Sequence, residues 1–201
     1  RRGKYQGLYC DNVEYEAVGL LGSNCDISDV ETLAYLNNLC DRLGLDNISA
    51  GNVLGFCMEA QERGILSPAE TDGIEIKFGD AEAMTVLLNK IARREGIGDL
   101  LANGVKATAE HLGKGAEEFA AQIKGLETPA WGPRGTVAMG LSYMTADRGG
   151  CHMRAFPIQY ETGEPWPKGV ELTPTSTEHK PELVIWEQNY VAAEYSLVIC
   201  D

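Results

Sequence analysis

The stretch of residues 124–154, KGLETPAWGPRGTVAMGLSYMTADRGGCHMR, places hydrogen-bond donors beside a backbone rich in glycine and proline. Glycine permits close backbone approach and positive φ, and proline fixes the direction of the chain. Arg134, Arg148 and His152 lie among these bends and can donate hydrogen bonds to a bound group. The alternative is a plain loop between two helices, with solvated arginines and a hydrogen-bonded core histidine. These residues alone leave both interpretations open.

Acidic side chains earlier in the chain are candidates for proton transfer or ligand binding. Glu16 follows a tyrosine in the segment VEYE, and Asp41 and Asp46 bracket Gly44 in the run DRLGLD. A partly desolvated Glu16 would suit the movement of a proton. Solvation is nevertheless the usual state of a glutamate, and a glycine helix cap followed by a turn would also explain DRLGLD.

The elements that must position these residues are helices. Apolar side chains recur at intervals near 3.6 residues in every long periodic segment, which predicts a mainly α fold. Ser28 is expected to cap a helix that ends before Gly44, Ser49 to cap a second helix, and Asp80 to cap a third. Further helices are predicted over residues 99–112, 116–121 and 135–147, and from Pro181 towards Cys200.

Composition narrows the class of protein. A chain of 201 residues with 44% hydrophobic content can form one or two globular domains with a sizeable core. The net charge of −13 argues against a nucleic-acid-binding surface. There is no apolar run long enough to span a bilayer and no signal-peptide pattern, so a cytoplasmic location is the default expectation.

The six cysteines are widely scattered and show neither a C-x-x-C pair nor the short spacing of a disulfide framework. Most of them are expected to be buried small hydrophobic residues. This chain by itself lacks four cysteines at the spacing of an iron–sulfur cluster.

Several runs, taken together and in order, resemble the aldehyde ferredoxin oxidoreductase family of tungsten or molybdenum bis-pterin enzymes. They are LGSNCDI, CDRLGLDNIS, REGIGDLLANG, the pattern KG-x-E-x-P, the turn PRG and the pattern RG-x-x-H. The resemblance covers nearly the whole chain. It implies a mainly α structure of two helical domains, residues 1–123 resembling domain 2 and residues 124–201 resembling the start of domain 3. The β-rich domain that forms the base for the pterins would be absent, so the chain looks like an incomplete piece.

The resemblance assigns cofactor contacts. It implies that Asp41 and Asp46 hold one pterin, with Gly44 allowing backbone approach and Leu45 adding backbone support. A carboxylate can accept two parallel N–H bonds from the amino-pyrimidinone edge of a pterin, so the chemistry suits these residues.

The resemblance also assigns catalytic roles. Glu16 would be the general base towards water or a hydrated carbonyl, and His152 would donate a hydrogen bond to a metal oxo group or to a substrate oxygen. Arg134 and Arg148 would either order the glycine-rich loop or meet a pterin phosphate. A structural histidine is the alternative for His152.

Near the end of the sequence the agreement with the family is partial. Cys200 stands where the family has the fourth ligand of a [4Fe–4S] cluster, with a buried structural cysteine as the alternative. Tyr195 replaces the family aspartate and Val198 the family glycine, which puts the contact to the second pterin in doubt.

The implied reaction is oxidation of a small aldehyde to a carboxylic acid, with water as oxygen source and electrons passed through the cluster to ferredoxin. The cofactors would be a tungstopterin or molybdopterin and a [4Fe–4S] cluster in the full-length enzyme. Enzymes of this family are often dimers, so the resemblance makes a homodimer an expectation. Two alternatives remain: the same scaffold acting on a phosphorylated aldehyde or reducing an aromatic thioester, and a cofactor-free helical interaction domain.

Overall fold

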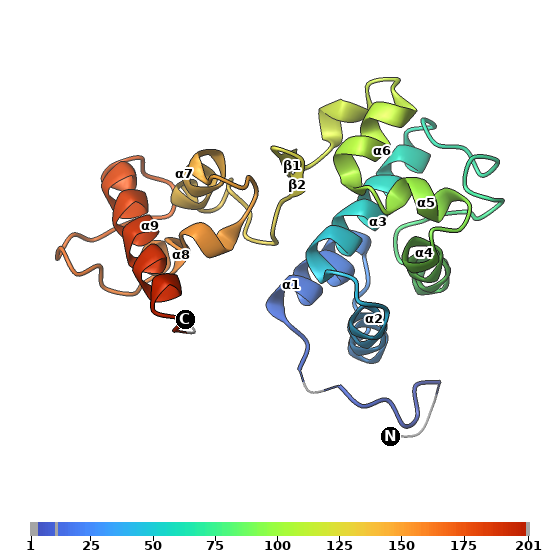
Figure 1. Cartoon of the computed structure of the whole chain (residues 1–201), viewed down its shortest axis with the longest axis horizontal. Helices are drawn as coiled ribbons and strands as arrows, with labels where there is room; N and C mark the ends of the chain where they lie inside the picture. The colour runs from blue at the N-terminus through green and yellow to red at the C-terminus, as the bar shows by residue number, and fades with distance from the viewer. Residues whose placement is uncertain (1–3, 11, 200–201) are drawn as a thin grey trace. The chain divides into compact units, whose positions relative to one another are not determined.

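Helix α3 (Asn47–Glu62) is the centre of the first part of the chain because it is covered on nearly all sides. In this computed structural model, which describes residues 4–10 and 12–199, every residue from Ala50 to Met58 is buried. A helix that is apolar all round belongs inside a domain. Helices α2 (Val30–Leu43), α4 (Ala81–Arg93) and α6 (Gly104–Leu112) pack against it (Figure 1).

The chain divides into two units, residues 1–130 and residues 131–201. Besides the helices above, the first unit contains short elements: α1 (Tyr15–Ala17), a π-helical turn (Val18–Gly22), a 3₁₀ turn (Ser23–Cys25), α5 (Ile97–Leu101), a 3₁₀ turn (Ala116–Phe119) and the strands β1 (Gln122–Ile123) and β2 (Leu126–Glu127). The second unit contains α7 (Val137–Thr145), a 3₁₀ turn (His152–Arg154), α8 (Ile158–Glu161) and α9 (Lys180–Ser196). The predicted mainly α class is confirmed for the described residues.

Strands β1 and β2 form an antiparallel hairpin with the register Gln122↔Glu127 and Ile123↔Leu126. This hairpin packs against α3 and α6 and belongs to the first unit. The predicted domain boundary at residue 124 falls in its turn, whereas the two units divide after Ala130. The boundary between the family's domains stays a prediction.

The predicted helix caps are correct for one helix and wrong for two. Asp80 caps α4 as expected, since its Oδ1 accepts from the backbone N–H groups of Glu82 and Ala83. Helix α2 is capped by Asp29 and not by the neighbouring Ser28, and α3 is capped by Asp46. Ser49 lies inside the first turn of α3 and donates its N–H to Asp46. Several residues in a row had the chemistry of a cap, and the path of the entering chain selected one.

The single helix predicted over residues 99–112 is two helices, α5 and α6. Gly104 adopts a φ of +87° at the junction, which a helix interior does not tolerate. Gly98 in α5 touches the backbone of α4, because a Cβ placed on it would lie 2.3 Å from the carbonyl carbon of Lys90. The positive φ of Gly104 therefore separates α5 from α6, and residue spacing alone does not reveal it.

The first unit has one continuous core. Its largest fully buried side chains come from α2, α3, α4, α5, the π-helical turn and the connector between α3 and α4: Leu21, Leu36, Leu54, Met58, Ile76, Met84, Leu87, Leu88 and Leu101. Burying each such side chain contributes about 1.5–3 kcal/mol relative to its exposure. None of the helices within the described residues is long and apolar enough to cross a membrane.

The second unit is held by a small apolar cluster and one buried ion pair. Helices α7 and α9 pack together around Ala138, Trp166, Leu183 and Val184. Lys180 lies 2.7 Å from Glu161 with both side chains almost fully covered. The carboxylate of Glu161 also accepts the N–H of Ala138 at the start of α7, so the pair joins α7, α8 and α9. As predicted, Pro181 lies in the first turn of the final helix.

Candidate functional site

The predicted cofactor loop lies between α2 and α3 and contains Asp41, Gly44, Leu45 and Asp46. Gly44 ends α2 with a φ of 69°, and the N–H of Leu45 bonds to the carbonyl of Cys40 at 2.9 Å. A Cβ built on Gly44 would meet no atom within 4 Å, so this face of the loop is open. Both aspartates are exposed. The loop thus presents two carboxylates on either side of an uncovered backbone.

Asn37 holds the two ends of this loop together. Its side chain is 2% exposed, and its Nδ2 donates to Asp41 Oδ2 at 3.1 Å. Its Oδ1 accepts from Asn47 Nδ2 at 3.2 Å, and Asn47 directly follows Asp46. A buried amide that satisfies groups on both sides fixes their separation. The sequence analysis did not single out Asn37.

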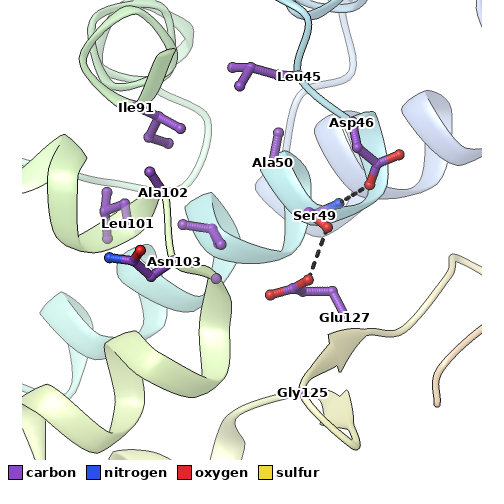
Figure 2. Close-up of a pocket in the computed structure, with 12 residues that line it drawn as sticks. Leu45, Asp46, Ser49, Ala50, Ile91, Leu101, Ala102, Asn103, Gly125 and Glu127 are labelled. Carbon is purple, nitrogen blue, oxygen red and sulfur yellow. Dashed lines mark hydrogen bonds between the residues drawn. The ribbon is translucent and has the colours of Figure 1, made fainter. Parts of the chain in front are cut away.

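A cavity of about 250 Å³ lies beside Asp46, between α3, α5, α6 and the hairpin (Figure 2). Leu45, Ala50, Ile91 and Leu101 are among its apolar lining residues. Its polar lining comes from Asp46, Ser49, Asn103 and Glu127.

Glu127 is the buried acid of this cavity, with 4% exposure. Its Oε1 accepts the N–H of Val105 at 2.7 Å, and its Oε2 accepts the hydroxyl of Ser49 at 2.9 Å. Figure 2 shows Ser49 lying between the carboxylates of Asp46 and Glu127. Glu127 is the acid of the KG-x-E-x-P run, but its sequence gave no signal that it would be buried against two helices.

Glu16 lies in α1, directly before the π-helical turn, and is half-buried. Its Oε2 accepts the N–H of Ala130 at 2.7 Å. Its neighbours Tyr15 and Val18 are exposed, so they do not cover the carboxylate. Single π turns are frequent at functional sites. The carboxylate of Glu16, which precedes the turn, accepts the backbone N–H of Ala130 through Oε2.

The remaining predicted residues lie in the second unit. His152 is half-buried in a 3₁₀ turn, and its ring meets that of Phe156 edge-on at 6.1 Å. The N–H of Phe156 donates to Glu187 Oε2 at 3.0 Å, which ties this turn to α9. Arg134 and Arg148 are exposed. Cys200 lies outside the described residues.

Burial controls the titratable groups that surround these sites. Desolvation raises the pKa of Glu187, whose side chain is 1% exposed. Burial raises the pKa of the thiols of Cys25, Cys40 and Cys57 to about 12. These three cysteines are therefore protonated apolar residues at neutral pH, as the scattered spacing predicted.

The cofactor loop fits the organic part of a pterin. Two exposed carboxylates can accept N–H bonds from the pyrimidinone edge, and the open face of Gly44 leaves room for the ring. Among the described residues, no group of three or more histidine, cysteine, aspartate or glutamate side chains is arranged to hold a metal ion.

Comparison with known proteins defines the class. Residues 1–201 match the family profile described as aldehyde ferredoxin oxidoreductase, domains 2 and 3. The chain is 42% identical over 149 residues to a tungsten-containing aldehyde ferredoxin oxidoreductase of Pyrococcus furiosus, covering 74% of this chain and 24% of that protein. The corresponding protein of Pyrococcus horikoshii is 35% identical over 192 residues, covering 93% and 31%. The helical scaffold is thus that of tungsten oxidoreductases.

This chain belongs to the aldehyde ferredoxin oxidoreductase family. It is also 37% identical over 172 residues to a P. furiosus protein named aliphatic sulfonate oxidoreductase, WOR-like subunit, covering 82% of this chain and 27% of that protein. The fold is similar to that in the active-site complex of a benzoyl-coenzyme A reductase with 1,5-dienoyl-CoA, with a TM-score of 0.68 and 24% identity over 89% of this chain and 32% of that one. The chain spans a quarter to a third of the length of these relatives.

Proposed function

We propose that this chain forms the helical part of a tungsten- or molybdenum-pterin oxidoreductase that oxidises aldehydes to carboxylic acids. Water would supply the oxygen, and electrons would pass through a [4Fe–4S] cluster to ferredoxin. The observation that carries the proposal is the open loop with Asp41 and Asp46, in a chain whose relatives include tungsten-containing aldehyde ferredoxin oxidoreductases. The activity is proposed for the longer polypeptide. A homodimer and a cytoplasmic location stay predictions.

In this proposal the loop binds one pterin. Asp41 and Asp46 accept N–H bonds from its pyrimidinone edge, and Gly44 and Leu45 offer backbone at the open face. The bound metal would supply the two-electron acceptor and the site of oxygen transfer. Asn37 keeps the two carboxylates at a fixed separation through its bonds to Asp41 and Asn47.

Glu16 acts as the general base in this proposal. Its Oε2 is held by the N–H of Ala130, so the carboxylate is oriented before a substrate arrives. It would take a proton from water or from a hydrated carbonyl. His152 would donate a hydrogen bond to the oxygen on which negative charge develops. Arg134 and Arg148 would meet the phosphate of a pterin or order the loop that carries them.

Replacement of Glu16 by glutamine tests this role in the full-length enzyme. The glutamine oxygen can still accept the N–H of Ala130, so the turn keeps its geometry while the basicity is lost. We expect turnover of an aldehyde to fall about 10²- to 10⁴-fold, with tungsten, molybdenum, pterin and iron content unchanged. The matched control is Glu14→Gln, an exposed acid two residues away that should keep normal turnover.

Near-normal turnover of Glu16→Gln at unchanged metal content would remove Glu16 from the mechanism. Wild-type protein that is folded but contains no tungsten, molybdenum or pterin would refute the oxidoreductase proposal and favour a cofactor-free helical domain. The analysis must be done on protein purified without oxygen, with acid-labile sulfide measured to test for the cluster.

A different substrate on the same scaffold is the second candidate. The 37% identity to a protein named as a subunit of an aliphatic sulfonate oxidoreductase supports it. Phosphorylated aldehydes and aromatic thioesters belong in the same substrate panel. Turnover of one of these in preference to all simple aldehydes would replace the aldehyde proposal.

A further inference from the structure

Residues 127–130 form a short segment, which we call the strap. Hydrogen bonds fix the strap to α3 and to Glu16 in α1. The carbonyl of Thr128 accepts from Asn52 Nδ2 at 2.9 Å, and the N–H of Ala130 donates to Glu16 Oε2 at 2.7 Å. Pro129 between them is buried. The strap therefore touches the centre of α3 at one point and the candidate base at another.

The strap also packs closely against the π-helical turn that follows Glu16. A Cβ built on Gly19, in the π-helical turn, would lie 2.3 Å from the Cβ of Ala130. A distance that short excludes any side chain at this point. A displacement of Ala130 is therefore transmitted directly to the turn and to the carboxylate that its N–H holds.

Glu127 anchors the other end of the strap. Its carboxylate bonds to the N–H of Val105 in the first turn of α6 and to the hydroxyl of Ser49 in the first turn of α3. One of these partners is a backbone N–H group at the start of a helix, where a carboxylate is a favourable acceptor. The approach to α6 is close, because a Cβ on Gly104 would lie 2.5 Å from Glu127 Oε1.

Ser49 extends this anchor to the cofactor loop. Its hydroxyl donates to Glu127, while its backbone N–H donates to Asp46 Oδ2 at 2.7 Å. One residue thus joins a buried carboxylate to an exposed one that faces the cavity (Figure 2). The path from Asp46 to Glu16 runs through Ser49, Glu127 and the strap, joined by hydrogen bonds at Ser49 and Ala130 and by the covalent chain between Glu127 and Ala130.

We propose that Glu127 is a positioning residue that fixes the cofactor loop relative to the general base Glu16, acting through Ser49 on one side and the strap on the other. The functional consequence rests on the proposed function, because it requires Asp46 to contact a pterin. The hydrogen-bonded connection between Asp46 and Glu16 does not depend on pterin binding. Glu127 itself touches neither substrate nor cofactor in this arrangement.

Replacement of Glu127 would leave the N–H of Val105 unpaired and risks unfolding the unit. The test therefore uses Ser49→Ala in the full-length enzyme, which removes the hydroxyl and keeps the backbone bond to Asp46. Ser49→Thr restores a hydroxyl at the same position. The matched control is Thr108→Val, which removes a buried hydroxyl in α6 that donates to the carbonyl of Gly104.

The first readout is hydrogen exchange of the amides in residues 44–50 and 127–131. Loss of a hydrogen bond to the buried carboxyl group of Glu127 should speed exchange at Ala130 about tenfold in Ser49→Ala. Ser49→Thr and Thr108→Val should exchange there as the wild type does. Unchanged exchange at Ala130 in Ser49→Ala would overturn the proposal, since Ala130 reports directly on the bond to Glu16.

The second readout is cofactor retention and turnover. Ser49→Ala should lose pterin on dialysis about tenfold faster than Ser49→Thr and should lower kcat more than it raises KM. Pterin loss and kcat equal to those of Ser49→Thr would overturn the functional part of the proposal. Wild-type protein without pterin would refute the proposed function instead, and the exchange result would still decide whether Glu127 connects the loop to Glu16.

Discussion

Replacement of Gly51 by alanine tests whether the π-helical turn is set by close packing on α3. A Cβ on Gly51 would lie 2.6 Å from the carbonyl carbon of Leu20, which is backbone and cannot swing away. Overpacking of a core typically destabilises the folded state by up to about 3 kcal/mol. Alanine stabilises a helix interior by about 1 kcal/mol relative to glycine, which offsets part of that loss. The expected net loss in the free energy of unfolding is therefore about 2 kcal/mol.

Gly55, one helical turn later in α3, provides the matched control. A Cβ there would meet the side-chain nitrogen of Asn24, which can rotate away at the loss of its hydrogen bond to the carbonyl of Gly51. That loss of about 1 kcal/mol offsets the gain in helix propensity, so Gly55→Ala should be nearly neutral. Urea unfolding of both variants measures the difference. Equal stability of Gly51→Ala and Gly55→Ala would refute the argument that the backbone of Leu20 packs against α3 too closely to move aside.

Two further predictions concern buried titratable groups. Because burial raises the pKa of Glu187, the folded state binds the proton more tightly than the unfolded state, and stability falls as pH rises above the ordinary glutamate pKa of about 4.5. Glu187→Gln keeps an acceptor for Phe156 and should flatten the fall of the unfolding free energy with pH above about 4.5; parallel curves for variant and wild type would contradict this. Cys25, Cys40 and Cys57, with pKa values of about 12, should resist a thiol reagent at pH 8 until the protein is unfolded, as mapped by mass spectrometry. Labelling of any of them in the folded protein would show that its burial is wrong.

The predicted site residues are divided between the two units, so each variant tests the residues of the unit in which it lies. Glu16, Asp41 and Asp46 belong to the first unit, where strap and loop are connected by hydrogen bonds. His152 belongs to the second unit, where Phe156 and Glu187 tie its turn to α9. Variants of Ser49 or Gly51 therefore probe the first group, and variants of Glu187 probe the second.

The mainly helical class followed from the sequence because helical periodicity and capping are local properties. Asp80 and Gly44 act where the pattern placed them, as a cap and a stop, since each needs only neighbours within one turn. The caps at Ser28 and Ser49 were wrong because an aspartate with equal capping ability stood nearby. The direction from which the chain enters the helix chose between them, and that direction depends on packing.

In the candidate site, too, the features that depend on packing could not be predicted from the sequence. The sequence indicated the family and the residues Glu16, Asp41, Asp46 and His152, whose roles stay predictions. It did not indicate Asn37 or the buried hydrogen bonds of Ser49 and Glu127, because a buried amide, hydroxyl or carboxylate resembles a solvated one in sequence. The hydrogen-bond partners of Glu127 are Val105 and Ser49, which lie 22 and 78 positions away from it in the sequence.

Sequence by itself therefore determined the helices, the mainly α class and the family, because these depend on local spacing and on ordered motifs. Only the tertiary structure decided the break between α5 and α6, the π-helical turn and the strap. The π-helical turn and the strap depend on close approaches at two glycines, Gly51 against the backbone of Leu20 and Gly19 against the Cβ of Ala130, and the helix break lies at Gly104 with its positive φ. Such contacts join residues far apart in the chain, and no local pattern encodes which glycine will be approached.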